Sequence, residues 1–257
     1  MDRTTWIARD FGRVATGFAS CVAECITRLG LAEGERVLDV GCGTGTLTLP
    51  AARAGAVATG IDRDPNRVAQ ASAHAAAEEL DVRFDVGDAE TLPYADGSFD
   101  TVVSMFGVMF AARPARAADE LLRVVRKGGR VVVASWTPSG FVGQMLHIVA
   151  DYLPPRADSA PALLWGEEAV ARERLGRAAR IGCVRRRIAF DYGTPPAETV
   201  RMFRECYEPT AHAFASLDAE RSLQLERDLL ALWIDHNRAS DGGTRVESEY
   251  LEVIAIR

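Results

Sequence analysis

Lysine is almost absent from this chain of 257 residues, and cysteine and histidine are sparse. Lys127 is the one lysine among thirty basic residues, a bias that suggests a GC-rich bacterial genome and says nothing about chemistry. The five cysteines contain no Cys-x-x-Cys pair, so we expect reduced thiols, as in a cytosolic protein. Cys21 and Cys25 lie four residues apart, but without a nearby histidine or third cysteine they make a poor metal site.

The sequence also contains no long apolar run and no excess of basic charge. No apolar segment is long enough to span a membrane, and Met1–Trp6 lacks the apolar core of a signal peptide. The formal net charge of -6 argues against a nucleic-acid partner. With 48% hydrophobic residues, the chain can form one elaborated globular domain. We therefore expect a cytoplasmic protein with a single domain, residues 1–257.

What the chain does contain is a glycine-rich turn in the stretch Val37–Leu47. A short apolar run, typical of a buried strand, leads into three alternate glycines and then a helix-compatible segment. Glycine permits positive φ and lets a ligand approach the backbone closely. Thr46 stands where a dinucleotide fingerprint needs its last glycine, which favours S-adenosylmethionine (SAM) over NAD. The candidate ligand-binding residues here are Asp39, Gly41, Cys42, Gly43 and Gly45.

A second acid follows at the end of the next predicted strand, Ala56–Asp62. Asp62 is placed to accept hydrogen bonds from both ribose hydroxyls of a nucleoside. A helix-capping role for Asp62 is disfavoured, because Asp64 and Pro65 already supply the cap and the first helical position. NAD enzymes use an acid in the same way, so an NAD-dependent oxidoreductase remains an alternative.

These segments resemble the first motifs of the class I SAM-dependent methyltransferases, and Gly87–Ala89 extends the resemblance. In that family the first loop wraps the methionine moiety of SAM. The resemblance implies that the Asp88 side chain accepts from the adenine amino group and that the Ala89 amide meets a ring nitrogen. Arg63, beside Asp62, and Met105, at the end of the fourth predicted strand, complete the candidate cofactor site.

The segment at the end of the fourth predicted strand, Ser104–Phe110, disfavours three classes of methyltransferase. It lacks the Pro-Pro-aromatic motif of nucleic-acid amino-methyltransferases. It lacks the glutamate pair of protein arginine methyltransferases and the acidic ligands of metal-dependent catechol enzymes. We expect no metal, and a small-molecule acceptor.

The order of elements predicts an α/β fold with a doubly wound, mostly parallel seven-stranded sheet, Rossmann-like, with helical insertions after strands five and six. Beyond Asp62 the expected strands are 82–86, 98–107, 130–136, 183–190 and 246–256. The main helices are expected at 45–54, 65–80 and 117–126, the last stopped by Lys127–Gly129.

Residues 1–30 are expected to form an N-terminal helical cap, where Arg9 and Phe11 could contact SAM as in related methyltransferases. The insertions, residues 137–181 and 195–240, could form a lid over the acceptor or the surface of a homodimer, and both remain open. Tyr207, His212 and His147 are the candidates for orienting the acceptor. No residue stands out as a general base.

The segment Leu122–Arg130 closely resembles the ubiquinone- and menaquinone-type branch of small-molecule methyltransferases. Four further segments resemble a bacterial branch of the type-11 class I methyltransferases: Trp136–Pro138, Leu164–Gly166, Tyr207–Thr210 and Glu249–Ala255. The resemblance implies methyl transfer from SAM to an O, N or C nucleophile of a small molecule, such as a secondary metabolite or a quinone-like acceptor. The product of the cofactor would be S-adenosyl-L-homocysteine. A non-catalytic SAM-binding regulatory protein is the second alternative.

Overall fold

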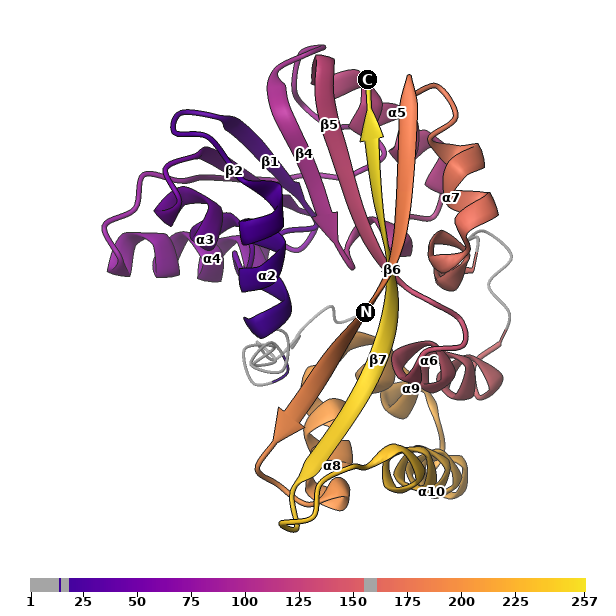
Figure 1. The fold of residues 1–257 in the computed structure, drawn as a ribbon. Coiled ribbons are helices and arrows are strands. Elements are labelled where there is room, and N and C mark those ends of the chain that lie inside the picture. Colours follow the sequence, from indigo (N-terminus) through magenta and orange to yellow (C-terminus); the bar gives the residue numbers. More distant parts are fainter. Residues whose placement is uncertain (1–13, 15–18, 155–160) are drawn as a thin grey trace, which may run out of the picture.

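The computed structural model of the chain describes Val14 and residues 19–154 and 161–257. Its centre is a seven-stranded sheet with the order β3-β2-β1-β4-β5-β7-β6 (Figure 1). The strands are β1 (Arg36–Val40), β2 (Val57–Asp62), β3 (Arg83–Val86), β4 (Phe99–Met105), β5 (Val125–Trp136), β6 (Arg180–Tyr192) and β7 (Thr244–Ile256). All pairs are parallel except those that β7 makes with β5 and β6. The doubly wound, mostly parallel sheet predicted from the sequence is confirmed.

Helices lie on both sides of this sheet (Figure 1). They are α2 (Ala19–Leu29), α3 (Thr48–Arg53), α4 (Pro65–Ala77), α5 (Pro114–Val124), α6 (Phe141–Asp151), α7 (Glu168–Arg174), α8 (Pro196–Cys206), α9 (Glu208–Ser216) and α10 (Ala219–His236), with short 3₁₀ turns at Val108–Phe110 and Ala162–Gly166. Consecutive residues of the central strands belong to different buried clusters: Val102 to one with α5, Val103 to one with α2 and α3. The central strands therefore read as continuous apolar runs because both faces are covered.

The last two strands are longer than the rest of the sheet and leave it together. β5 pairs with β7 only from Arg130 to Trp136, opposite Ile256 to Tyr250, whereas β6 pairs with β7 along all thirteen residues. The halves Arg187–Tyr192 and Thr244–Glu249 thus form a two-stranded ribbon beyond the sheet. Helices α6, α8, α9 and α10 gather around this ribbon (Figure 1). They come from the two segments expected to be insertions.

Several element boundaries differ from those expected. Helix α5 stops at Val124, so Lys127–Gly129 does not end it but lies within β5. Val125 is fully buried and pairs with Phe99, and the next pair is Thr101 with Arg130, so the register shifts there. Two consecutive buried valines favour the extended backbone over another helical turn. Strand β6 also extends beyond the expected 183–190, because β7 offers a partner along its whole length.

The described residues include the end of the expected N-terminal helix and the whole helix after β1. Helix α2 accounts for the end of the predicted N-terminal cap, while Arg9 and Phe11 lie outside the described residues. Helix α3 starts at Thr48 rather than Gly45, because Gly45 has φ +87 and belongs to the turn. In the part of the chain that is described, no helix combines the length and apolar character needed to cross a bilayer.

Candidate functional site

Three glycines shape the turn between β1 and α3 by adopting a left-handed backbone. Their φ angles are +74 for Gly41, +56 for Gly43 and +87 for Gly45. Residues other than glycine rarely adopt such angles. The backbone therefore requires glycine at all three positions, as the sequence predicted.

The space around these glycines differs: one packs closely against another turn, and another has room beside it. A Cβ on Gly41 would lie 2.8 Å from the Cα of Gly107, so the turns after β1 and β4 touch backbone to backbone. A Cβ on Gly43 would meet no atom of the described residues within 4 Å. Within the described part of the chain, the fold thus packs against Gly41 and leaves space beside Gly43.

Asp62, at the carboxyl end of β2, connects this turn to the next one. Its carboxylate is buried and accepts hydrogen bonds from the amides of Gly43 and Asp64, each at 2.9 Å. Asp64 caps α4 by accepting from the Asn66 amide at 2.9 Å, as predicted. Each carboxylate oxygen of Asp62 has a second lone pair. It can therefore still accept from a diol.

The turn after β3 also reaches Asp62. The amide of Gly87 donates to the Asp62 carbonyl at 2.9 Å. Asp88 is exposed and accepts from the Glu90 amide at 2.9 Å, and Ala89 lies half-buried against the main core. Three turns therefore meet at the carboxyl ends of β1, β2 and β3, the edge where ligands bind in open α/β sheets.

The carboxyl end of β4 is tied to the same edge. The Ser104 hydroxyl donates to the Val40 carbonyl at 2.6 Å and accepts from the Val108 amide at 2.9 Å. Met105 is half-buried beside it. The next residue, Phe106, has φ +58, and its ring stacks on Trp136 with centroids 3.8 Å apart. A left-handed phenylalanine is uncommon and costs free energy, and such residues cluster at functional sites.

Asp39 and Cys42 lie beneath the turn rather than on its open side. The Asp39 carboxylate is 3% exposed and accepts from the Thr48 hydroxyl at 2.6 Å. Burial raises the pKa of Asp39 to about 7, and the charge of Asp62 adds to this effect. Cys42 is 5% exposed, and its sulfur would lie 2.9 Å from a Cβ on Gly60. Its amide donates to the Ile61 carbonyl at 3.1 Å.

Arg63 points toward the helices around the ribbon. Its guanidinium lies 3.6 Å from Glu208, the first residue of α9, and Arg67 of α4 lies 2.6 Å from the same carboxylate. An ion-pair cluster therefore joins the elements beside Asp62 to α9.

The three acceptor candidates are not brought together. Tyr207, between α8 and α9, is 6% exposed and packs on Phe203 with ring centroids 5.5 Å apart. Burial raises the pKa of the Tyr207 hydroxyl. His212 on α9 and His147 on α6 are both exposed. Their roles remain predictions.

The sequence pointed to neither Ser104, Phe106 nor His74. The Nδ1 atom of His74, on α4, lies 3.2 Å from the carbonyl oxygen of Thr44 in the glycine turn. Thirty residues separate the two, so no local pattern could reveal the contact. A serine inside the apolar strand β4 was the one available signal.

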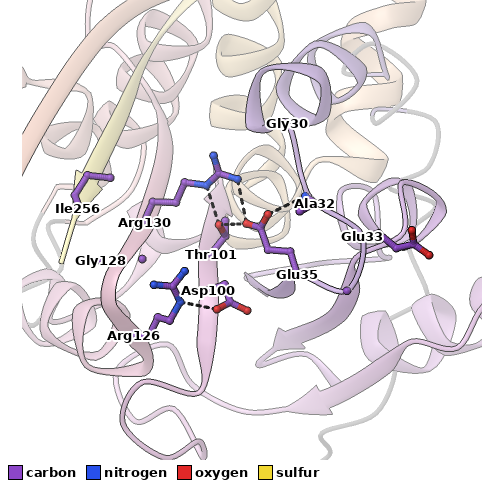
Figure 2. Close-up of a pocket in the computed structure, with 12 residues that line it drawn as sticks. Gly30, Ala32, Glu33, Glu35, Asp100, Thr101, Arg126, Gly128, Arg130 and Ile256 are labelled. Carbon is purple, nitrogen blue, oxygen red and sulfur yellow. Dashed lines mark hydrogen bonds and ion pairs between the residues drawn. The ribbon is translucent and has the colours of Figure 1, made fainter.

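A hollow of about 540 Å³ lies at the opposite, amino edge of the sheet (Figure 2). Its carboxylates already have partners: Glu35 binds Thr101 and Arg130, and Asp100 binds Arg126 and Arg36. We interpret these hydrogen bonds and ion pairs as structural contacts that connect the amino ends of neighbouring strands. Among the described residues, no three His, Cys, Asp or Glu side chains gather as metal ligands would.

Comparison with known proteins places this geometry in a family. The methyltransferase domain model Methyltransf_11 matches residues 38–133. An uncharacterised protein of Mycobacterium tuberculosis is 36% identical over 98% of this chain and 93% of its own length. A demethylmenaquinone methyltransferase of Renibacterium salmoninarum is 36% identical over 50% of this chain and 52% of its own length.

The fold is also found among solved structures. The YcgJ protein of Bacillus subtilis superposes with a TM-score of 0.62 at 19% identity, covering 93% of this chain and 98% of that one. At this identity the likeness concerns the fold alone. The family match and the methyltransferase relative favour a methyltransferase over the NAD-dependent oxidoreductase. The chain belongs to the type-11 family of class I methyltransferases, enzymes whose family and fold imply the use of SAM.

Proposed function

We propose that this enzyme transfers a methyl group from SAM, by in-line displacement, to an oxygen, nitrogen or carbon nucleophile of a small organic molecule. A secondary metabolite or a quinone-like compound would be the acceptor, and S-adenosyl-L-homocysteine the second product. The observation that carries the proposal is that Asp62 joins two of the turns. Its carboxylate accepts a hydrogen bond from the Gly43 amide and its backbone carbonyl accepts one from the Gly87 amide, each at 2.9 Å. The adenine, ribose and methionine parts of SAM need three neighbouring binding surfaces, and we assign these to the three turns at one edge of the sheet.

The open space beside Gly43 supports the fit of the cofactor. A Cβ there would meet no atom of the described chain within 4 Å, so a ligand can approach the backbone. We assign the ribose hydroxyls to the free lone pairs of Asp62 and the adenine to Asp88 and Ala89. The methionine moiety is assigned to the turn, with Met105 and Arg63 at its margins, and the turn residues are Asp39, Gly41, Cys42, Gly43 and Gly45.

Asp39 and Cys42 act differently from the other turn residues in this proposal. The Asp39 carboxyl holds the start of α3 through Thr48, so it shapes the turn from below. The Cys42 side chain packs over Gly60, so its backbone alone is available to a ligand.

The bound cofactor supplies a methyl group that is already activated on a sulfonium. The chain then has to align the nucleophile behind that methyl group and exclude water, and positioning of this kind contributes about 7–11 kcal/mol to a barrier. We assign this task to α6 and α8–α10, the helices around the ribbon, as an acceptor-site lid. Glu208 would hold α9 next to the ribose site through Arg63 and Arg67.

Tyr207 is the best placed of the three acceptor candidates, because it precedes Glu208 directly. Burial raises the pKa of its hydroxyl, so at neutral pH it stays protonated and can donate a hydrogen bond. It would orient an acceptor oxygen rather than remove a proton. His212 and His147, both exposed, would need a substrate that extends to the surface.

Calorimetry with SAM tests the cofactor site. We expect Asp62→Ala and Gly43→Val to weaken binding strongly while both chains still fold. Gly242→Val is the matched control, because Gly242 has φ +87 and open space around it, like Gly43, but lies in the loop before β7. Parent-like SAM affinity in both site variants would refute the assignment.

Two further measurements test the chemistry and the acceptor. NADH should not compete with SAM for the site. Incubation with SAM labelled in its methyl group and a small-molecule extract of the host should yield a labelled product, which identifies the acceptor and the methylated atom together. Label that appears only in protein or nucleic acid would overturn the small-molecule proposal.

A further inference from the structure

The glycine turn is held from outside by a histidine that the cofactor site does not otherwise involve. His74 lies near the end of α4, and its Nδ1 atom is 3.2 Å from the carbonyl oxygen of Thr44. A carbonyl can only accept, so Nδ1 must carry the hydrogen and donate. The contact joins residues thirty positions apart and reaches the middle of the turn.

The peptide group that accepts this hydrogen bond lies between two glycines, whose backbone is the least restricted by side chains. Thr44 stands between Gly43 and Gly45, whose φ angles are +56 and +87. Glycine loses more conformational freedom on folding than any other residue, so the turn depends on hydrogen bonds to stay in one shape.

Those hydrogen bonds come from two directions. On one side, the Ile61 carbonyl accepts from the amides of Gly41 and Cys42, and the Asp62 carboxylate accepts from the Gly43 amide. On the other side, His74 donates to Thr44. Residues of strand β2 and of the helix α4 that follows it therefore form hydrogen bonds with successive peptide groups of the turn.

Packing does not account for a histidine at position 74. Its side chain is exposed, and the last seven residues of α4, 71–77, otherwise contain only alanine and one serine. Ser72 spends its hydroxyl on the Val68 carbonyl of its own helix at 2.9 Å. The buried residues of α4 are Val68, Ala71 and Ala75, so the exposed His74 borders the buried face of the helix without being part of it.

We propose that His74 is a positioning residue: it holds the Gly43–Gly45 turn in the shape that receives SAM, without touching the cofactor. This inference rests on the proposed function, because it assigns the turn to SAM. It predicts that the loss of this one hydrogen-bond donor on α4 weakens cofactor binding.

Three substitutions at this position separate the donor from the bulk of the ring. His74→Asn keeps a donor nitrogen close to the place of Nδ1, and His74→Asp has nearly the same shape but can only accept. His74→Ala removes the side chain and favours the helix. The exposed position leaves all three free to fold, which thermal unfolding checks directly.

Calorimetric titration with SAM is the test. We expect binding to weaken by about fivefold in His74→Ala, the effect of one net hydrogen bond, and by at least as much in His74→Asp. His74→Asn should bind within about twofold of the parent on the same scale. Parent-like affinity in the alanine and aspartate variants, or equal weakening in all three, would overturn the inference.

A second measurement needs no ligand and therefore separates this inference from the proposed function. Amide hydrogen exchange at Gly43 and Gly45, followed by NMR in the free protein, should be faster in His74→Ala than in the parent and restored in His74→Asn. If the parent binds no SAM but the amide exchange rates follow this order, the proposed function is overturned while the stabilisation of the turn by His74 stands. Unchanged exchange in His74→Ala would refute that stabilisation.

Discussion

Asp39→Asn tests the electrostatics beneath the glycine turn. Asp39 is 3% exposed and accepts from the Thr48 hydroxyl, a contact that the asparagine oxygen can keep. Burial, reinforced by Asp62, raises the pKa of the carboxyl from 3.8 to about 7. A difference of about 3 pKa units corresponds to about 4 kcal/mol, since each unit is worth 1.36 kcal/mol.

The sign follows from which state binds the proton more tightly. Between pH 4 and pH 7 the folded chain keeps Asp39 protonated while the unfolded chain has released the proton, so this group stabilises the fold at low pH. That contribution is complete below the unfolded pKa and is lost as the pH rises through about 7. Asparagine does not titrate. The free energy of unfolding of Asp39→Asn minus that of the parent should therefore fall by about 2 kcal/mol from pH 8 to pH 5.5.

Urea unfolding at several pH values measures this difference and cancels the groups common to both chains. Asp100→Asn is the control with the opposite shift. The guanidinium of Arg36, with that of Arg126, holds the pKa of Asp100 below its usual range, so this carboxyl is ionised throughout pH 5.5–8. Its difference curve should be flat there. A flat curve for Asp39→Asn as well would show that Asp39 titrates normally, and would refute the burial argument.

Two further substitutions test the packing of the edge and of the sheet. Gly41→Ala should lower the free energy of unfolding by about 2–4 kcal/mol, because the new Cβ would lie 2.8 Å from the Gly107 backbone at a φ of +74. Gly43→Ala has space for the Cβ and should lower it by no more than about 1–2 kcal/mol. Equal losses for the two variants in urea unfolding would contradict this packing argument. Glu252→Gln should lower the free energy of unfolding by about 2 kcal/mol, since this carboxylate is 4% exposed and binds Arg28 and Arg186, both at 2.7 Å. Glu247→Gln, at an exposed position, is the control. A loss no larger than that of the control would refute a stabilising role for the two ion pairs of Glu252.

The turns were predictable because their residues act locally. Glycine at positive φ, and an acid at the end of a strand followed by Asp64 and Pro65, depend on neighbours within a few positions. The doubly wound, mostly parallel sheet followed from alternating strands and helices, for which few topologies exist. The family resemblance supplied the assignment of SAM, which the glycine pattern alone left open against NAD.

The failed boundaries show where local reasoning stops. Lys127–Gly129 has the composition of a helix end, yet Val125 already pairs with Phe99 and draws those residues into β5. In the same way β6 extends to Tyr192 because β7 accompanies it. The competing factor in both cases is a partner strand far away in the sequence.

The acceptor side was the least predictable part of the site. Val200, Phe203 and Tyr207 recur at helical spacing in the sequence, and all three are buried. Spacing could not tell that Tyr207 points into the interior while His212, five residues later, is exposed. That depends on how α8 and α9 pack against the ribbon.

By itself, the sequence determined where the chain turns and which turns can admit a nucleoside, because glycine, proline and capping acids restrict the backbone within a few residues. Tertiary structure alone decided that Gly41 meets Gly107, that Asp39 lies buried beneath the turn and that His74 reaches Thr44. These contacts join residues 30 or more positions apart or depend on complete burial. They exist only once the sheet and its helices have packed together, and no local pattern encodes them.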